Sequence, residues 1–525
     1  MLGTSFGSLV FIRICIWFLS SITPAAVAYL VYAITTGKTT NYLILEAYCA
    51  AETAFYFVYY LPRKRNLQRP ASHPPRHPYS HRQALFQKCL STISDPKSYI
   101  SGWFHGAPYT SVYRENLAEF LAWGFLDRDT LPEKGSEDWE ELEGYVDATE
   151  KAMGLELKPG YNPEVKALRL TVDPVRMTHR SLAWYLMISV VDLLTSAGLY
   201  FRGFRLLPTS GWYQIFPLRF HAPLMSLGIA SPAKDLSYWF KPHRSPTSLP
   251  VVFLHGLGVG LYPYVPFLGE LSASLGPDTG LIVIEIMPIS TRICHDPTSI
   301  PEFNRQILQI LSFHGIDKFI LAGHSYGTIL STHLLAHPHI REKIEGVVLI
   351  DPISFLLHLP DVAYNFTART PRGANERQLE YFASRDPGIS GTICRHFFWG
   401  RNVLWKEDLM GGDEIPGVKA AVALGWRDLI VNIPAVWEYL NDGDERVESN
   451  GNASGHSSGA KDEMGGQARD RDQEMTDATV TTKEGIRLLR YGDCDHAQVF
   501  DTKERRKRIV DVVVEFSRGG GKKAE

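Results

Sequence analysis

The run Phe319-Ile320-Leu321-Ala322-Gly323-His324-Ser325-Tyr326-Gly327-Thr328-Ile329-Leu330 specifies a strand, a tight turn and a helix in succession. The apolar residues before Gly323 are typical of a buried strand, and the residues from Thr328 onward continue with helical character. The G-x-S-x-G pattern between them is typical of a sharp turn that presents a serine as a nucleophile, with small glycines where the chains pass closely. Ser325 is therefore the candidate nucleophile. A merely structural serine in a glycine turn is the alternative, and the flanking strand and helix disfavour it.

A second glycine-rich turn, His255-Gly256-Leu257-Gly258, follows the apolar run from Val251 to Leu254. Acyl transfer needs backbone N–H groups that point at the developing oxyanion. A loop after a central strand can supply one donor, and the residue after the serine can supply the other. We assign these donors to Leu257 and Tyr326. An ordinary glycine-rich turn is the alternative, which its position ahead of the serine turn disfavours.

A histidine follows the last predicted strand, in the run Gly492-Asp493-Cys494-Asp495-His496. The chain has 18 histidines, and this one alone comes after that strand. A general base must reach the nucleophile from a loop. His496 is therefore the candidate base.

Two aspartates could orient this histidine. Asp428 follows the predicted strand that ends at Leu424, and Asp351 directly follows the run Val347-Val348-Leu349-Ile350. We favour Asp428, because the turn after the penultimate strand is the usual place for the acid when serine, acid and histidine follow in that order. Asp351, the alternative acid, would then orient a turn or line the pocket. Asp493 and Asp495 lie too close to His496 along the chain to be first choices.

Short apolar runs alternate with helical stretches through the second half of the chain. Strand, helix and strand at this spacing predict right-handed crossovers and a mostly parallel sheet, hence an α/β domain over residues 236–518. The runs expected to be strands are Pro250–Leu254, Gly280–Ile286, Lys318–Ala322, Gly346–Ile350, Ala420–Leu424 and Ile486–Tyr491, and a basic helix, Lys503–Phe516, follows them.

Residues 236–518 resemble the α/β-hydrolase superfamily. The resemblance rests on four features: His255-Gly256-Leu257-Gly258, Gly323 to Gly327, Asp428 and Asp495-His496. With its apolar N-terminus, the chain is similar to membrane-anchored fungal serine hydrolases. The resemblance implies a mostly parallel eight-stranded sheet, a site at the carboxyl ends of its strands and a helical lid over residues 355–418. Aromatic residues of that lid suit an apolar acyl pocket, with core packing as the alternative; they are Phe397, Phe398, Trp399 and Trp405.

Composition excludes several classes of protein. The 525 residues carry a net charge of -3, which gives no electrostatic reason to expect nucleic acid as a partner. The six cysteines show no C-x-x-C spacing, so neither a zinc site nor a disulfide framework is predicted. We expect no metal and no organic cofactor, and a catalytic domain that faces the cytosol.

Residues 1–62 are expected to form a membrane anchor. The run from Leu9 to Ile34 has Arg13 as its one charge and is long enough to cross a bilayer. A second run, Tyr42 to Leu61, stops at Pro62 and contains Glu46 and Glu52, which should face protein or the interface. We favour a two-helix hairpin over a single span. The basic cluster Arg63, Lys64, Arg65 and Arg69 then predicts a cytosolic catalytic domain, although sequons at Asn365 and Asn452 point the other way.

The remaining segments carry no catalytic motif. Residues 63–80 are rich in proline, histidine and arginine and are predicted to be a linker. Residues 81–235 are predicted to be helical; the apolar run Ala183–Phe201 within them is either a core helix or a surface that dips into the membrane. Residues 441–484 are predicted to be a disordered insertion, and residues 519–525 a tail.

Together these features predict a membrane-anchored serine hydrolase that cleaves carboxylic esters of lipophilic substrates through Ser325, Asp428 and His496. An acyltransferase or a thioesterase would use the same three residues and is one alternative. A catalytically silent hydrolase fold that serves as a membrane scaffold is the other. The sequence says nothing about oligomeric state.

Overall fold

The computed structural model describes residues 3–226, 228–411, 417–441 and 476–519. Within these residues a nine-stranded sheet has the order β1-β2-β4-β3-β5-β6-β7-β9-β8. The neighbouring strands β4, β3, β5, β6, β7 and β9 pair in parallel. At the two edges, β1 pairs with β2, β2 with β4 and β8 with β9 in antiparallel fashion. The strands are β1 (Arg205–Leu207), β2 (Ser237–Lys241), β3 (Val251–Leu254), β4 (Leu281–Glu285), β5 (Phe319–His324), β6 (Ile344–Ile350), β7 (Lys419–Gly425), β8 (Ala478–Thr481) and β9 (Arg487–Tyr491).

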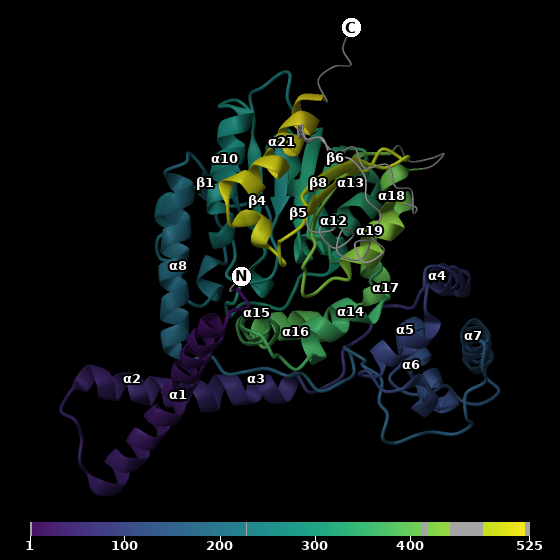
Figure 1. Cartoon of the computed structure of the whole chain (residues 1–525). Coiled ribbons are helices and arrows are strands. Elements are labelled where there is room, and N and C mark those ends of the chain that lie inside the picture. Colours follow the sequence, from purple (N-terminus) through teal and green to yellow (C-terminus); the bar gives the residue numbers. More distant parts are fainter. Residues whose placement is uncertain (1–2, 227, 412–416, 442–475, 520–525) are drawn as a thin grey trace, which may run out of the picture.

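Helices cover both faces of the sheet (Figure 1). One face packs against α10 (Val265–Leu275) and α21 (Lys503–Gly519), and the other against α11 (Ile300–Phe313), α12 (Tyr326–Ala336) and α19 (Ile433–Asn441). Because both faces are covered, the central strands are continuous apolar runs rather than alternating ones. Every residue of β3, β4 and β5 is buried. The predicted mostly parallel α/β architecture is confirmed.

The sheet differs from the prediction at its edges. It has nine strands rather than eight. Strand β1 lies before residue 236, and β8 lies inside the predicted insertion 441–484, most of which (442–475) is outside the described residues. Both strands are short and pair with a single neighbour each, so the sheet itself supplies most of the reason for their extended conformation.

A series of short helices occupies the predicted lid between β6 and β7. They are α14 (Pro360–Ala363), the π-helical turn η6 (Tyr364–Ala368), α15 (Ala374–Leu379), the π-helical turn η7 (Glu380–Ser384), α16 (Pro387–Arg395), α17 (Trp399–Asn402) and α18 (Lys406–Met410). The lid is packed between the sheet and the helical region that precedes the sheet in sequence. A Cβ atom at Gly102 would lie 2.5 Å from Cγ of Pro360, so the two layers are in direct contact there.

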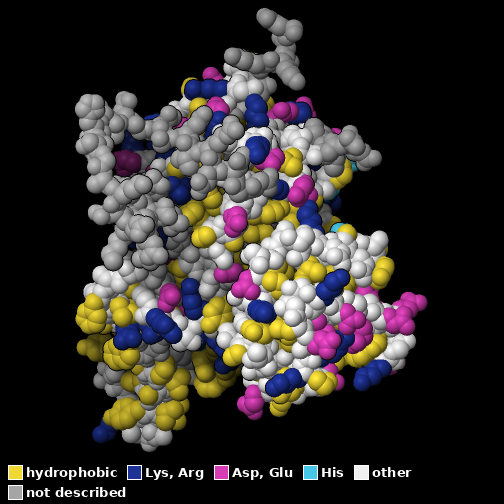
Figure 2. Space-filling model, turned by 45° about the vertical axis from the view of Figure 1, so that its right-hand side comes forward, with side chains coloured by type: hydrophobic (Ala, Val, Ile, Leu, Met, Phe, Trp, Pro, Cys, Tyr) yellow, Lys and Arg dark blue, Asp and Glu magenta, His cyan; other side chains and the backbone are white. Residues whose placement is uncertain are grey.

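That preceding region belongs to the same core as the sheet. It contains α4 (Tyr79–Ser91), α5 (Pro96–Trp103), α6 (Arg114–Leu126) and α7 (Glu137–Met153). Apolar residues of these helices, such as Leu117 and Leu142, share one buried cluster with Phe355 of the lid. The outer surface of these helices carries mixed charges (lower right of Figure 2). Residues 79–153 are therefore an integral layer of the body.

The N-terminal helices project from the body (Figure 1). They are α1 (Phe6–Thr36) and a continuous second helix made of α2 (Leu43–Ala54), the π-helical turn η1 (Phe55–Tyr60) and α3 (Leu61–Asn66). The second helix thus continues past Pro62, contrary to the expectation that it stops there and that a linker begins at residue 63. The π-helical turn just before Pro62 accommodates a residue that has no N–H to donate.

Two helices among the described residues are long and apolar enough to cross a membrane, α1 and α8 (Leu182–Tyr200). Helix α1 exposes most of its apolar side chains, and hydrophobic residues gather on the projecting hairpin at the lower left of Figure 2. Glu52 of α2 is fully buried. It accepts a hydrogen bond from Oγ1 of Thr23 in α1 at 2.5 Å and one from the backbone N–H of Leu182 at 2.7 Å. This carboxylate therefore ties α1 and α2 to the start of α8.

Helix α8 has one face buried against the body and an exposed face that is apolar. One face is buried against the body, where Asp192 forms a buried ion pair with Arg292 and lies 3.9 Å from Arg219. The opposite face leaves large apolar side chains in the open, namely Leu186, Met187, Val190, Leu193 and Leu194. Helix α8 is thus neither a fully buried core helix nor free of the body, and contact of its outer face with a membrane stays a prediction.

Candidate active site

Ser325 lies between the end of β5 and the start of α12, as the G-x-S-x-G pattern predicts. Its backbone has φ 51° and ψ -119°, a conformation that costs a residue with a side chain of the order of 1–3 kcal/mol. The turn is possible because Gly327 has no side chain: a Cβ atom there would lie 2.3 Å from the carbonyl oxygen of Leu254. The close approach of β3 to the start of α12 therefore holds the strained turn in place.

His496 and Asp428 come to Ser325 from two separate loops. His496 lies after β9 and Asp428 after β7, so all three residues are at the carboxyl ends of parallel strands. Nε2 of His496 is 2.8 Å from Oγ of Ser325, and its Nδ1 is 2.6 Å from Oδ2 of Asp428. With Nδ1–H donating to the carboxylate, Nε2 is left to accept the proton of the serine hydroxyl. The arrangement is an unbroken hydrogen-bonded chain of three buried side chains.

The carboxylate also sets the proton affinity of the imidazole. Burial by itself lowers the pKa of His496, but the charge of Asp428 and its hydrogen bond outweigh burial and raise that pKa to about 9. The other oxygen of Asp428, Oδ1, accepts the backbone N–H groups of Ile430 and Val431 at 2.7 and 3.1 Å. These bonds hold the carboxylate in the orientation that reaches the histidine.

Asp351 has a different role and bridges the two loops through its carboxylate. Its carboxylate accepts the backbone N–H of Gly425 at 3.0 Å and that of Ala497 at 2.8 Å. It therefore joins the loop that leads to Asp428 with the loop that carries His496, and the structure brings Asp428, not Asp351, to Nδ1 of the histidine. The side chain of Asp351 is fully buried in this position.

Asp495 has a role that the sequence did not reveal. One of its oxygens accepts the backbone N–H groups of His496 and Leu429 at 2.7 and 3.0 Å. The other oxygen accepts the side-chain amide of Asn375, in helix α15 of the lid, at 2.7 Å. Asp495 thus links the histidine loop, the Asp428 loop and the lid. Its place next to His496 was visible in the sequence, but no local pattern points to Asn375.

The predicted oxyanion donors lie near the serine. Leu257 lines the same cavity as Ser325, and Tyr326 is the first residue of α12, where backbone N–H groups have no partner within the helix. A Cβ atom at Gly256 would lie 2.8 Å from Cβ of Ser325, so only glycine lets this turn approach the serine so closely. The backbone of Gly258 donates to the carbonyl of Ile289 at 3.1 Å, which fixes the far end of the turn.

Two buried histidines, His255 and His324, stabilise this turn. Nε2 of His255 accepts the backbone N–H of Ile286 at 2.9 Å, and burial lowers the pKa of His255 to about 4, so this ring is neutral. The hydroxyl of Tyr264 accepts the N–H of Gly256 at 3.1 Å and lies 2.7 Å from Nδ1 of His324. The motif residues Gly256 and His324 are therefore connected through one tyrosine, which couples the two glycine-rich turns.

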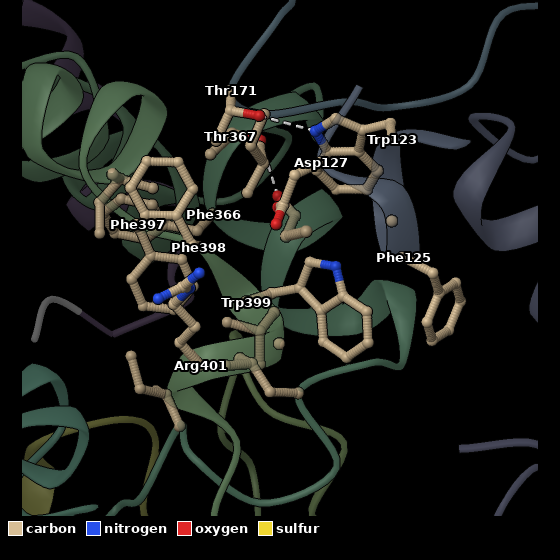
Figure 3. A pocket seen from close by; sticks show the side chains of 18 of the residues that line it. Trp123, Phe125, Asp127, Thr171, Phe366, Thr367, Phe397, Phe398, Trp399 and Arg401 are labelled. Carbon is tan, nitrogen blue, oxygen red and sulfur yellow. Dashed lines mark hydrogen bonds between the residues drawn. The ribbon is translucent and has the colours of Figure 1, made fainter. Parts of the chain in front are cut away.

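A narrow cavity opens beside Ser325, with about 70 Å³ of free space. Three of the lid aromatics that we expected at an acyl pocket line it, namely Phe397, Phe398 and Trp399 (Figure 3). The fourth, Trp405, lines a neighbouring groove of about 1,100 Å³ instead. Trp103, Trp123 and Phe125 also line the cavity, and they come from α5 and α6, a region for which the sequence suggested no role in the site. Among the described residues, no group of three or more His, Cys, Asp or Glu side chains is arranged to hold a metal ion.

Comparison with known proteins agrees with this architecture. Residues 250–401 match the family described as α/β hydrolase fold. Triacylglycerol lipase 1 of Arabidopsis thaliana is 41% identical over 54 residues, which is 10% of this chain and 14% of the relative. The match therefore spans only a small part of that lipase.

Among solved structures, a carboxylesterase of Nitrososphaera gargenis is 14% identical with a TM-score of 0.32, covering 54% of this chain and 96% of its own. A meta-cleavage product hydrolase of Pseudomonas fluorescens is 17% identical with a TM-score of 0.35, covering 54% of this chain and 94% of its own. Neither identity is high enough to inform on substrate. The family match and the strand order establish that this chain has the α/β-hydrolase fold.

Proposed function

We propose that this protein is a serine hydrolase that cleaves carboxylic esters of lipophilic substrates. The observation that carries the proposal is the hydrogen-bonded chain from Asp428 through His496 to Ser325 at the carboxyl ends of the strands. A serine is a weak nucleophile unless an adjacent base takes its proton, and a base with its second nitrogen held by a carboxylate is the arrangement that does so. The strained turn at Ser325 is further support, because strain of this kind persists where function requires it.

The reaction follows from these positions. Nε2 of His496 accepts the proton of Ser325 as Oγ attacks the ester carbonyl, and the N–H groups of Leu257 and Tyr326 bind the oxyanion that forms. The protonated His496 then donates its proton to the leaving alkoxide, which departs as the alcohol. Water attacks the acyl-enzyme with His496 again as base, and the acid is released as Ser325 recovers its proton. Asp428 keeps the imidazole in the required tautomer and stabilises its charged form.

A lipophilic substrate is supported by the walls of the cavity beside Ser325, which are mainly aromatic and aliphatic. The resemblance of a short segment to a plant triacylglycerol lipase agrees with this substrate class. We further propose that α1, paired with the second helix, anchors the protein in a membrane, with the catalytic domain on the cytosolic side. Support comes from the length and apolar surface of α1 and from the basic residues of α3 that follow the hairpin.

Labelling with a fluorophosphonate probe tests the proposal, on the full chain solubilised in detergent. We expect the wild type to be labelled and both Ser325→Ala and His496→Ala to lose labelling. Ser312→Ala and His339→Ala are matched controls, because both residues are exposed on helices away from the site, and they should label normally. Folded wild type that does not react with the probe would overturn the proposal and favour a silent scaffold.

Release of a free acid separates hydrolysis from the alternatives. With an ester substrate in water, a hydrolase yields acid and alcohol in equal amounts. If added alcohol or thiol diverts most of the acyl group into a new ester or thioester, the protein is an acyltransferase that uses the same three residues.

A further inference from the structure

The cavity beside Ser325 has two walls of different origin. One wall comes from the lid, with Phe366 and Phe397, and the other comes from α6, with Trp123 and Phe125 (Figure 3). Trp399 of the lid joins them: its ring lies edge-on to Phe125, with ring centroids 5.5 Å apart. The helical region before the sheet is therefore part of the boundary of the cavity and does more than cover the lid.

Polar side chains in this cavity are already bonded to the protein. The indole N–H of Trp123 donates to Oγ1 of Thr171 at 2.7 Å; that oxygen lies 3.3 Å from Nε2 of His73, whose Nδ1 is 3.2 Å from Asp127. Three further polar side chains of the lining have partners: Arg82 pairs with Glu141, one N–H of Arg401 donates to the carbonyl of Pro75, and Thr367 donates to that of Ala363.

Some polar groups of the lining are not bonded in this way, and His77 is one example. Nε2 of His77 has no hydrogen-bond partner among the described residues, and its ring stacks on His81 with centroids 4.2 Å apart. His77 also lines the larger groove, so it stands where the cavity meets that groove. Most of the lining is aromatic or aliphatic, and polar groups make up the smaller part of it. An occupant therefore gains free energy there mainly by burying hydrocarbon.

We infer that this cavity is a slot for the acyl chain of the substrate, and that α6 sets the length of the chain that fits. The inference rests on the proposed function, since it takes the acyl group to be bound to Ser325. Leu85 and Gly400 line both the cavity and the neighbouring groove, and a Cβ atom on Gly400 would lie 3.2 Å from Cδ2 of Leu85, so no chain passes between these two residues. The slot is therefore closed between these residues, and esters of unbranched chains short enough to fit it should be preferred over those of bulky or branched acids.

Gly124 provides the test. It lies in α6, lines the slot, and a Cβ atom there would meet only Nε1 of Trp399, at 4.0 Å. Gly124→Leu should thus place a side chain into the slot without distorting the helix, since leucine has a higher helix propensity than glycine. Gly144→Leu is the matched control: Gly144 lies in α7, is exposed, and has open space where the side chain would grow.

The measurement is kcat/KM for the 4-nitrophenyl esters of butanoate, octanoate, dodecanoate and hexadecanoate, together with the rate of labelling by a short fluorophosphonate. We expect Gly124→Leu to lose activity on the long esters, by about tenfold for every two methylenes that no longer fit. Butanoate hydrolysis and labelling should stay within about twofold of wild type, and Gly144→Leu should match wild type throughout. Trp399→Ala should shift the preference toward longer chains.

An unchanged chain-length profile in Gly124→Leu, with normal labelling, would overturn this inference and leave the proposed function intact. Equal losses for all esters and for labelling would also overturn it, because they indicate general damage rather than a length limit. Absence of labelling in the wild type would instead refute the proposed function.

Discussion

Replacing Asp428 by asparagine removes the charge that holds His496 in its working state. The contact with Asp428 is the main reason that the pKa of His496 rises to about 9. A return from about 9 to the ordinary value of about 6.5 corresponds to roughly 3 kcal/mol of lost stabilisation of the imidazolium, or a factor of a few hundred in its formation. The asparagine side chain can also present an N–H to Nδ1, which would favour the wrong tautomer. Together the two effects should slow acylation of Ser325 by about a thousandfold or more.

The rate of acylation should depend on pH through the protonation of His496. His496 acts as a base only when neutral, so in the wild type the rate of acylation should rise with pH and level off near pH 9. In Asp428→Asn the inflection should move toward about 6.5, while the plateau falls. The assay is the second-order rate of fluorophosphonate labelling between pH 5 and 10, with Asp493→Asn as control, because Asp493 is exposed and pairs with Arg505 on the surface.

Two results would refute this reasoning. If Asp428→Asn keeps both the plateau and the inflection, its carboxylate does not orient the histidine. If Asp351→Asn produces the larger shift of the inflection, Asp351 is the acid despite its hydrogen bonds to Gly425 and Ala497.

Three further predictions follow from single contacts. Gly327→Ala should unfold or strongly destabilise the protein, by about 3 kcal/mol, because its Cβ atom would lie 2.3 Å from the carbonyl oxygen of Leu254; chemical denaturation measures this, and an unchanged midpoint would contradict it. Asn375→Leu should leave Asp495 without its lid partner and slow ester hydrolysis by about tenfold, with kcat falling more than KM rises; an effect confined to KM would contradict a role in positioning His496. Glu52→Gln should lower the free energy of unfolding in detergent by about 1–3 kcal/mol and speed proteolysis of the N-terminal hairpin. The reason is that an amide cannot accept from all the donors around this buried carboxylate. An unchanged melting temperature would show that the contact does not anchor the hairpin.

Local signals in the sequence were enough to predict the α/β sheet and the turn at Ser325. The strand before this turn is a continuous apolar run, and its glycines are required by contacts that any such turn makes. These features depend on residues within about one element of each other, so a single sequence reveals them. The position of His496 could be predicted for the same reason, since it follows a recognisable last strand.

The tertiary structure shows the contacts that distinguish the two aspartates. Asp351 and Asp428 both follow a buried strand, and the sequence favoured Asp428 from the order of the strands alone. The difference lies in the path of each loop, which brings one carboxylate to Nδ1 of His496 and directs the other to backbone N–H groups. Asp192 is a similar case: in the sequence it interrupts an apolar run, and its partner Arg292 is 100 residues away along the chain.

The wall of the acyl slot depended on tertiary structure entirely. Trp123 and Phe125 precede Ser325 by a long stretch of chain, in helix α6, which carries no motif. They reach the cavity because α5 and α6 pack on the lid, as at the contact between Gly102 and Pro360. Sequence alone determined the candidate residues for the chemistry, because turns and strands are encoded locally. Which surfaces surround those residues was decided by the packing of distant segments, because apolar side chains specify burial but not the partner against which they are buried.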